Sequence, residues 1–439
     1  MKDNKIDEYD EAIAYLESLE TFGWQPGLQR IEKLLSILGS PQNDYQSIHV
    51  GGTNGKGSVT VTLAKILKDQ GYKVGQFISP DMFDFRERIQ FNGNWTEKAS
   101  LVKQIRKIKE AISQMVAAGD EHPTNFEVST ALAFLYFSEK NIDIAVVEVG
   151  LGGAIDSTNV ITPLISVITN VTMDHKEYLG NTEEEIAKVK AGIIKNGVPV
   201  VTGSLDSDVL KVIEEKAKSC GSKVYRIGYE FSALPKSFSK RGSYFIFQNK
   251  DWEKRILFSL VGHHQVRNGA LALETIWCLK ENGLIIDEEK MRGSMEHVLW
   301  PGRLELIEYK GKRILLDAAH NVDGAKHLGL ALKSIYPFRK FVFVLGILGD
   351  KQRQEMMQYL GPVADAIVVT KPNSPRAGDY EIIATLAKEY VSDVILEPNI
   401  EEAVAIGLSK ANENDIVCIT GSIYMIKEAR HYFKGGLLK

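Results

Sequence analysis

A glycine-rich stretch, HVGGTNGKGSVT at residues 49–60, has the residue types of a phosphate-binding loop but not the usual spacing. Loops of this kind place Ser or Thr directly after the Lys, where the hydroxyl meets the magnesium ion of a nucleotide. Here Lys56 is followed by Gly57, and the hydroxyl comes one residue later, at Ser58. Because a helix starting at the loop can still turn Ser58 or Thr60 toward a metal between phosphates, we interpret the stretch as a nucleotide site.

The elements around this loop support that interpretation. SIHV, residues 47–50, is typical of a buried strand, and residues 57–71 are typical of a helix that ends at Gly71. Glycines at such a turn let backbone N–H groups approach an anion, and the helix directs its positive end to the same place. The alternative is a turn whose glycines only pack a helix closely against a strand. Four glycines around Lys56 favour the nucleotide site; they are Gly51, Gly52, Gly55 and Gly57.

An acid and an imidazole follow two further predicted strands. Glu148 closes the run IDIAVVEV before GLGG, and His175 follows the run LISVITNV by a few residues. Ligands of an open parallel sheet collect beyond the carboxyl ends of its strands, so both side chains are expected near the glycine loop. A carboxylate suits Mg²⁺, although imidazole is less typical for so hard a cation. The alternative is that Glu148 and His175 are ordinary helix-capping or surface residues.

Other polar residues have two interpretations from pattern alone. Lys190 lies on an amphipathic helix, where a Lys is usually solvated. Asp156 and the cluster TNFE at residues 124–127 are either walls of a substrate site or ordinary turn residues.

The C-terminal part has a similar group of polar residues. The motif LDAAHN places Asp317 and His320 at a predicted strand end, and Arg303 stands shortly before it. Arg303 has the geometry to grip a phosphate; the alternative is a hairpin stabilised by its own polar turn.

The elements that position these residues alternate between strand and helix. Runs rich in Val and Ile recur at 47–52, 73–79, 142–150, 164–171 and 198–203, with helical periods at 96–116 and 182–195 between some of them. This alternation predicts an α/β fold: a doubly wound parallel sheet of the P-loop ATPase type, with helices on both faces.

A second domain is expected after Pro301 and Gly302, which precede a hairpin turning at Lys310 and Gly311. Strand-like runs then start again at 340–348, 365–370, 393–398 and 415–420. We therefore predict an ATP-binding domain over 1–298 and a smaller Rossmann-like domain over 299–439. Residues 242–260 differ, since two alternating runs around a polar turn predict an antiparallel hairpin at the edge of the first domain.

Composition limits the function classes. The chain has 439 residues, 44% of them hydrophobic, a formal net charge of −4 and three scattered cysteines. These values give no basic field for nucleic acid and no disulfide framework. The N-terminal 20 residues are charged and helical in period, without the apolar core of a signal peptide, and no later run is long enough to cross a bilayer. We expect a soluble cytoplasmic protein without nucleic-acid or membrane partners, most simply a monomer.

Several separated stretches together resemble the folylpolyglutamate synthase and dihydrofolate synthase family, relatives of the bacterial Mur peptide ligases. They run through nearly the whole chain in order: PGLQRIEKLLSILGSPQ, HVGGTNGKGSV, FISP with ERIQFNG, VVEVGLGGAIDSTNVI, MDHKEYLGNTEEEIAKVKAGIIK, GHHQVRNGALA, WPGRLE, LDAAHN, LGILGDK and TGSIYMIKEAR. The family's loop carries Ser two positions after its Lys, so the resemblance accounts for the displaced hydroxyl.

The resemblance implies roles for individual residues. It implies ATP binding by Asn54, Gly55, Lys56, Gly57, Ser58, Asn268, Arg303 and Asp317. It implies a magnesium site formed by Ser58, Ser79, Glu148, His175 and Lys190, with Lys190 carbamylated. It implies catalytic roles for Lys56, His175, Lys190 and His320, and folate contacts from Leu28, Arg30, Phe126, Glu127 and Asp156.

The implied activity is ATP-dependent addition of L-glutamate to a folate, with dihydropteroate as a possible second acceptor, and with ATP and Mg²⁺ as cofactors. Two positions depart from the common family pattern: Asp81 stands where many members have His, and Ala154 where Arg is common. Both bear on the identity of the substrate. The rival interpretations are a Mur-type ligase acting on a cell-wall precursor and a nucleotide-dependent regulatory module.

Overall fold

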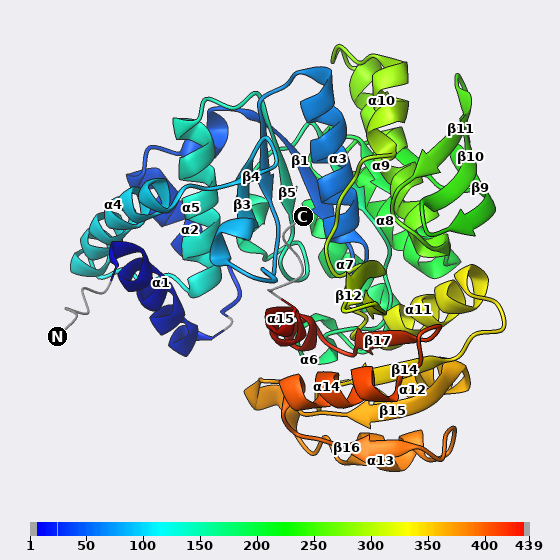
Figure 1. Ribbon diagram of the computed structural model, residues 1–439. Coiled ribbons are helices and arrows are strands. Elements are labelled where there is room, and N and C mark those ends of the chain that lie inside the picture. The colour runs from blue at the N-terminus through cyan, green and yellow to red at the C-terminus, as the bar shows by residue number, and fades with distance from the viewer. Residues whose placement is uncertain (1–6, 24, 434–439) are drawn as a thin grey trace. The chain divides into compact units, whose positions relative to one another are not determined.

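The computed structural model describes residues 7–23 and 25–433 (Figure 1). The helical period predicted over residues 1–6 lies outside this range, as do the last six residues of the predicted second domain. The described chain divides into two compact units. The first holds the residues up to Leu234, with Ile246–Lys254 and Arg267–Met295, and the second holds Pro235–Phe245, Arg255–Val266 and the residues from Glu296 onward. The division at 298/299 stays a prediction about the domains.

An eight-stranded sheet in the order β4-β3-β2-β5-β1-β6-β7-β8 forms the centre of the first unit. Its strands are β1 Gln46–Gly51, β2 Val74–Phe77, β3 Ile89–Phe91, β4 Asn94–Trp95, β5 Ile144–Glu148, β6 Ile165–Ile168, β7 Val200–Thr202 and β8 Val224–Arg226. Strands β2, β5, β1, β6, β7 and β8 pair in parallel, which confirms the predicted parallel sheet. The antiparallel edge of β3 and β4 is not predicted, because two or three residues are too few to show a period.

Helices cover both faces of this sheet, as its fully buried strands require. The helices are α1 Glu8–Ser18, α2 Gln29–Ile37, α3 Lys56–Gln70, α4 Lys98–Ala117, α5 Asn125–Glu139, α6 Lys176–Leu179, α7 Glu183–Lys190, α8 Ser207–Ser219, α9 His263–Glu281 and α10 Glu288–Met295. Helices α1, α2, α4 and α5 share one apolar core with β2 and β5. Figure 1 shows α2, α4 and α5 on one side of the sheet and α3 on the other.

Two helix ends have the capping residues that the sequence indicates. Helix α3 stops where Gly71 takes the left-handed conformation, with φ of 101°. Helix α7 begins after Thr182, whose side chain accepts a hydrogen bond from the backbone N–H of Glu185. Helix α3 therefore stops, and helix α7 starts, where the sequence predicts.

The segment 242–260 forms the predicted hairpin, but its setting differs from the prediction. Strands β10 Gly242–Asn249 and β11 Glu253–Phe258 belong to a separate three-stranded sheet with β9 Phe231–Ser239, in the order β11-β10-β9. The hairpin is therefore part of a small sheet of its own, whose third strand is not predicted. The sequence pattern does not predict β9, because FSALPKSFS holds a Pro and several polar residues that are typical of a loop.

The second unit contains a six-stranded sheet in the order β12-β13-β17-β14-β15-β16. Its strands are β12 Glu305–Tyr309, β13 Lys312–Leu316, β14 Phe341–Leu345, β15 Ala364–Val369, β16 Val394–Leu396 and β17 Ile416–Thr420, and its helices are α11 Val322–Ile335, α12 Arg353–Leu360, α13 Ile382–Ala387, α14 Ile400–Lys410 and α15 Ile423–Tyr432. Strands β12 and β13 form the predicted antiparallel hairpin, and the other strands pair in parallel. The predicted second α/β unit is confirmed.

The three cysteines are free, and Cys278 and Cys418 are buried. None of the helices within residues 7–23 and 25–433 combines the length and the apolar character that a bilayer span requires.

Candidate active site

The glycine turn between β1 and α3 is packed so closely that two of its residues have to be glycine. A Cβ on Gly52, at φ of 134°, would lie 1.9 Å from Oγ1 of Thr169, and one on Gly55, at φ of 85°, would lie 2.5 Å from Oδ1 of Asn268. Asn268 on α9 therefore sits directly against the loop, although it is far away in the sequence. The structure thus brings this predicted nucleotide residue to the glycine turn.

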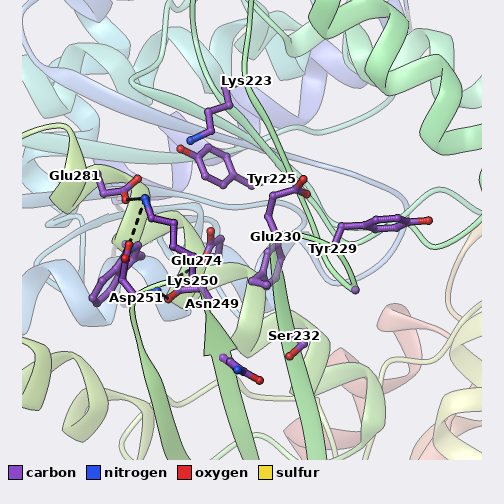
Figure 2. Close-up of a pocket in the computed structure, with 14 residues that line it drawn as sticks. Lys223, Tyr225, Tyr229, Glu230, Ser232, Asn249, Lys250, Asp251, Glu274 and Glu281 are labelled. Carbon is purple, nitrogen blue, oxygen red and sulfur yellow. Dashed lines mark hydrogen bonds and ion pairs between the residues drawn. The ribbon is translucent and has the colours of Figure 1, made fainter.

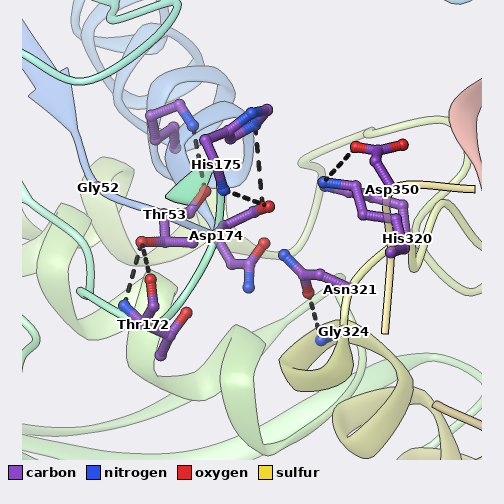
Figure 3. A network of polar contacts seen from close by, with 12 residues as sticks. Gly52, Thr53, Thr172, Asp174, His175, His320, Asn321, Gly324 and Asp350 are labelled. Atoms are coloured by element: carbon purple, nitrogen blue, oxygen red, sulfur yellow. Dashed lines mark hydrogen bonds and ion pairs between the residues drawn. The ribbon is translucent and has the colours of Figure 1, made fainter. Parts of the chain in front are cut away.

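The segment after β6 holds the turn in place. Oγ1 of Thr169 donates to the carbonyl of Asn54 at 2.7 Å, and Oδ1 of Asn170 accepts from the backbone N–H of Asn54 at 2.8 Å. Oγ1 of Thr53 donates to the carbonyl of Thr172 at 3.1 Å (Figure 3). Since the N–H of Asn54 is directed into the protein, the loop has to present other amides to a phosphate.

Lys56 and Ser58, the loop residues whose side chains can contact a phosphate or its metal ion, lie at the start of α3. Nζ of Lys56 donates to the carbonyl of Thr53 at 3.1 Å, so the ammonium group folds back over the turn. Ser58 is buried in the first turn of the helix. Both residues therefore lie at the positive end of α3, where an anion is stabilised.

Glu148 lies beside this turn because of strand register. It is the last residue of β5, its Cα pairs with that of Val50 on β1, and its side chain is buried. Oε2 of Glu148 accepts a hydrogen bond from the backbone N–H of Ser79 at 3.3 Å. Ser79 follows the neighbouring strand β2. The backbone of one predicted metal ligand therefore contacts the side chain of another.

His175 lies in a left-handed turn immediately before α6, with φ of 50°. Its backbone N–H donates to Oδ1 of Asp174 at 2.9 Å, and its Nε2 lies 4.0 Å from Oδ2 of Asp174 (Figure 3). Sequence reasoning missed Asp174, a largely buried acid that precedes the imidazole. The motif MDH contains the signal, because an acid next to a candidate ligand can orient it.

Lys190 is buried rather than solvated, contrary to what its helical period predicts. Only 4% of its surface is exposed, and Nζ donates to the carbonyl of Gly52 at 2.9 Å. The reason is the loop GLGG: a Cβ on Gly153 would lie 2.8 Å from the carbonyl of Val189, so this loop covers the end of α7. Tertiary packing thus overrides the usual preference of Lys for solvent.

The environment of Lys190 favours an uncharged amine. Burial and the nearby charge of Lys56 lower its pKa to about 7, against the opposing effect of Asp174 and Asp156. A neutral amine is a nucleophile, whereas an ammonium group is not.

The residues predicted for the folate side form a second group around α2 and α5. Nε of Arg30 lies 3.1 Å from Oε2 of Glu127, whose side chain is only 2% exposed, and Leu28 and Phe126 pack against the same apolar core. Glu127 also closes a capping box with Thr124 at the start of α5. The motif TNFE is therefore a helix start, and Glu127 has a structural role beside any contact with substrate.

Asp156 is also held by internal contacts. Its carboxylate accepts from the backbone N–H groups of Leu151 at 2.8 Å and Thr158 at 3.0 Å, and burial raises its pKa against these bonds. The hydroxyl of Thr158 in turn contacts Nε2 of the buried His49 at 2.8 Å. Asp156 thus fixes the loop that follows GLGG.

The two positions that depart from the family pattern have defined contacts. Oδ1 of Asp81 pairs with the guanidinium of Arg88 at 2.7 Å. Ala154 packs on Gly192, where an added Cβ would lie 2.3 Å from the Cβ of Ala154. A charged pair and a small side chain therefore stand where His and Arg are common in the family.

In the second unit, Asp317 organises the segment that carries Arg303. Its buried carboxylate accepts from the backbone N–H groups of Leu304 at 2.9 Å and Ala319 at 3.0 Å. Burial raises the pKa of Asp317, and the charge of Arg303 opposes that shift. Nδ1 of His320 lies 2.9 Å from the carbonyl of Ala318. Arg303, Asp317 and His320 thus belong to one connected group of loops.

The donor set fits a magnesium ion under one chemical condition. Among the described residues, no three His, Cys, Asp or Glu side chains are grouped as metal ligands. The predicted set contains one such acid, Glu148, one imidazole, His175, and two hydroxyls, with Lys190 as the remaining member. An ammonium group would repel a cation, whereas a carbamate on Lys190 would supply the oxygen ligands that Mg²⁺ prefers. The residues therefore fit the ion if Lys190 is carbamylated.

Comparison with known proteins agrees with this architecture. The Mur ligase middle domain model matches residues 50–276, and the model of the Mur ligase glutamate ligase domain matches residues 302–423. The fold and the glycine turn therefore define a ligase of the Mur class.

Individual relatives define the family within this class. The chain is 36% identical to the dihydrofolate synthase/folylpolyglutamate synthase of Bacillus subtilis (strain 168), over 97% of this chain and 99% of that protein. It is 36% identical to the folylpolyglutamate synthase of Lacticaseibacillus casei, over 98% and 99%. The crystal structure of Mycobacterium tuberculosis folylpolyglutamate synthase complexed with ADP matches with a TM-score of 0.90 at 33% identity, over 97% of this chain and 99% of that one. The chain belongs to the folylpolyglutamate synthase and dihydrofolate synthase family, as its motifs predict.

Proposed function

We propose that this protein is an ATP-dependent ligase that joins L-glutamate to the γ-carboxylate of a folate. The observation that supports it is that Lys56 and Lys190 both donate to carbonyls of one glycine turn, with Glu148 at the end of the neighbouring strand, in a chain that matches folate ligases over nearly its full length. Related structures hold ADP and AMPPCP, or DHPP with ADP, which supports ATP and a small pterin-bearing acid as substrates.

Activation of the acid is the first chemical requirement, because a carboxylate has a poor leaving group and resists attack by an amine. An oxygen of the γ-carboxylate attacks the γ-phosphorus of ATP, the bond to the β-phosphate oxygen breaks, and ADP leaves. The ammonium group of Lys56 and the available amides of the glycine turn stabilise the charge that develops on the phosphoryl oxygens. The product of this step is an acyl phosphate.

Amide formation completes the reaction. The amino group of glutamate attacks the carbonyl carbon, phosphate leaves, and the nitrogen loses a proton. We propose catalytic roles for His175, Lys190 and His320 beside that of Lys56: the imidazole of His320 can accept this proton near neutral pH, and His175 and the carbamate of Lys190 would act through the ion that they hold.

We propose that Ser58, Ser79, Glu148, His175 and carbamylated Lys190 hold Mg²⁺, which would neutralise phosphate charge when bound. We further propose that ATP is contacted by Asn54, Gly55, Gly57 and Asn268 in the first unit and by Arg303 and Asp317 in the second. The folate contacts proposed are Leu28, Arg30, Phe126, Glu127 and Asp156.

The setting of the reaction is also a proposal. A net charge of −4 and buried free cysteines support a cytoplasmic monomer that acts on small molecules, without nucleic-acid or membrane partners. The two structural domains proposed are residues 1–298 and 299–439.

The test is incubation of the purified chain with ATP, Mg²⁺ and labelled glutamate, with tetrahydrofolate, dihydropteroate or a cell-wall precursor as the acceptor. The proposal predicts a product heavier by one or more glutamyl residues with tetrahydrofolate, and ADP formation that requires both the folate and glutamate. Product from dihydropteroate would add dihydrofolate synthase activity. ADP formation that needs no acceptor, or product only from the cell-wall precursor, would overturn the proposal.

A further inference from the structure

A cavity of about 520 Å³ lies in the first unit, between the second half of α9, the strand β8 and the start of the three-stranded sheet (Figure 2). Its volume falls in the usual range for small-molecule sites, about 300–1,000 Å³. None of its 14 lining residues is among the predicted nucleotide, metal or folate residues. The cavity is thus separate in composition from the candidate active site.

One buried acid faces this cavity. Glu274 on α9 is only 2% exposed, and its Oε2 accepts a hydrogen bond from Nδ2 of Asn249 at 3.0 Å. Within the described part of the chain its other carboxyl oxygen makes no hydrogen bond, and this oxygen is not fully buried. Because Glu274 lines the cavity, this oxygen is open to a ligand there (Figure 2). A ligand in the cavity can therefore supply the hydrogen-bond donor that this oxygen lacks.

Aromatic side chains form much of the wall. Tyr225, Phe231 and Trp277 are largely buried and line the cavity, and the more exposed Tyr229 stands at its rim. Trp277 is held in place by stacking on Trp252, with ring centroids 5.7 Å apart. Walls of this kind suit a flat body, and aromatic faces attract cations.

The lining includes four carboxyl groups, from Glu230, Asp251, Glu274 and Glu281, and two ammonium groups. Oε1 of Glu230 lies 2.6 Å from Nη2 of Arg226, so the charge of Glu230 is matched from outside the lining. Nζ of Lys250 lies 3.5 Å from a carboxylate oxygen of Asp251 and of Glu281, so its charge is already matched. Among the lining acids only Glu274 is deeply buried, so it is the carboxyl group whose charge is least screened by water.

We propose that this cavity binds a planar organic cation of the amidinium or protonated aminoheterocycle class. The ligand donates an N–H to the open oxygen of Glu274 and lays its flat body against Tyr225 and Trp277. A charge-assisted hydrogen bond of this kind is the strongest polar contact the lining offers.

Binding should be coupled to a proton. Burial, with the charges of Glu281 and Glu230, raises the pKa of Glu274 to about 7, while Asn249 and Lys223 oppose the shift. A bound cation stabilises the carboxylate and lowers this pKa, so binding near neutral pH releases a proton and tightens as the pH rises.

Two further titratable groups near Glu274 do not contribute to this release. Burial raises the pKa of the Cys278 thiol and of the Tyr225 phenol, so both stay neutral over the same range. The pH dependence of binding therefore reports on Glu274.

Titration calorimetry of the full chain with benzamidine tests the proposal, with neutral benzamide as the shape-matched control. We expect saturable binding of benzamidine alone, affinity that is higher at about pH 8 than at about pH 6, and a heat that varies with buffer ionisation enthalpy because a proton is released. Equal binding of benzamide, or no binding of benzamidine, would overturn the proposal.

Two variants locate the site. Glu274→Gln keeps an oxygen for Asn249 but removes the charge, and it should weaken benzamidine binding about tenfold or more and abolish proton release. Glu253→Gln changes an exposed acid outside the lining and should bind like the parent chain. Should Glu274→Gln prove unstable, Trp277→Leu at the wall provides the second test. Unchanged affinity in a folded Glu274→Gln chain would contradict the proposal.

Discussion

Nζ of Lys190 donates a hydrogen bond to the backbone carbonyl of Gly52 across 2.9 Å and so joins the end of α7 to the glycine turn 138 residues away. The contact places a buried amine within the electrostatic reach of Lys56. Lys190 therefore lies beside the turn that is proposed to bind phosphate, and substitutions at either place should affect the reaction.

Replacing Lys56 by Ala should lower product formation about 100-fold or more, because a charge that stabilises the transferring phosphoryl group is lost. The fold should be retained, since within residues 7–23 and 25–433 the side chain of Lys56 makes one hydrogen bond, to the turn itself. Steady-state rates of product formation, with circular dichroism for the fold, check both statements. Lys68→Ala, which removes an exposed Lys from the same helix, is the matched control and should react at the parent rate.

Activity should fall as the pH drops through about 7, because protonation of Lys190 prevents its reaction with carbon dioxide. Carbon-13 NMR with labelled bicarbonate should show a carbamate resonance above this pH, absent from Lys190→Met. Lys190→Ala should be inactive and should regain part of its activity with added formate or acetate. A fully active Lys190→Ala chain would exclude the role proposed for the carbamate.

The same amine should affect stability. The pKa of Lys190 is lowered in the folded chain from 10.5 to about 7, so the unfolded state binds more protons between these values. In buffers free of carbon dioxide, the free energy of unfolding should therefore rise with pH from about 7 to about 10. Lys190→Met should lose this part of the slope, as measured by denaturant unfolding at several pH values. An unchanged slope would mean that Lys190 is charged in the folded chain.

Glu148→Gln should raise the Mg²⁺ concentration needed for half-maximal rate about tenfold or more, since a carboxylate is a far better ligand for this ion than an amide. Titration of activity against Mg²⁺ measures the change directly. Glu215→Gln, on the exposed side of α8, should leave the requirement unaltered. If both variants respond alike, Glu148 is not a metal ligand.

Arg30 and Glu127 allow folate binding to be separated from stability. Arg30→Met leaves the acid of Glu127 buried without its ion pair and should destabilise the chain by about 3 kcal/mol. The double variant Arg30→Met with Glu127→Gln should recover most of that stability. Its KM for folate should remain raised while its KM for ATP stays near the parent value. If the double variant regained both the parent KM for folate and the parent stability, Arg30 would have a structural role and no role in folate binding.

The sequence predicts the parts of the site that lie at the ends of recognisable strands. Glu148 and the glycine turn follow from strand ends, because register in a parallel sheet places them together. Lys190 could not be placed from its helical period, since a loop about 35 residues earlier in the chain buries it. Its importance is implied by family resemblance alone.

Other features leave little trace in the sequence. Glu274 is one acid on a helix, and nothing in its neighbours shows that strands from another sheet enclose it. Strand β9 could not be predicted for a similar reason. Its polar composition is not typical of a strand, and it is stabilised by pairing with β10. Both the burial of Glu274 and the pairing of β9 depend on residues distant in the chain, so the periodicity of the local sequence does not predict them.

Transfer of a carboxylate oxygen to phosphate distinguishes an acyl phosphate from other routes to the amide. A folate whose γ-carboxylate carries oxygen-18 is incubated with the purified chain, ATP, Mg²⁺ and glutamate, and the released phosphate is analysed by mass spectrometry. We expect one oxygen-18 atom in the phosphate for each amide formed, because the carboxylate oxygen remains on the phosphoryl group when the amine displaces it. Phosphate without the label, formed alongside product, would contradict the acyl phosphate and the site proposed to make it.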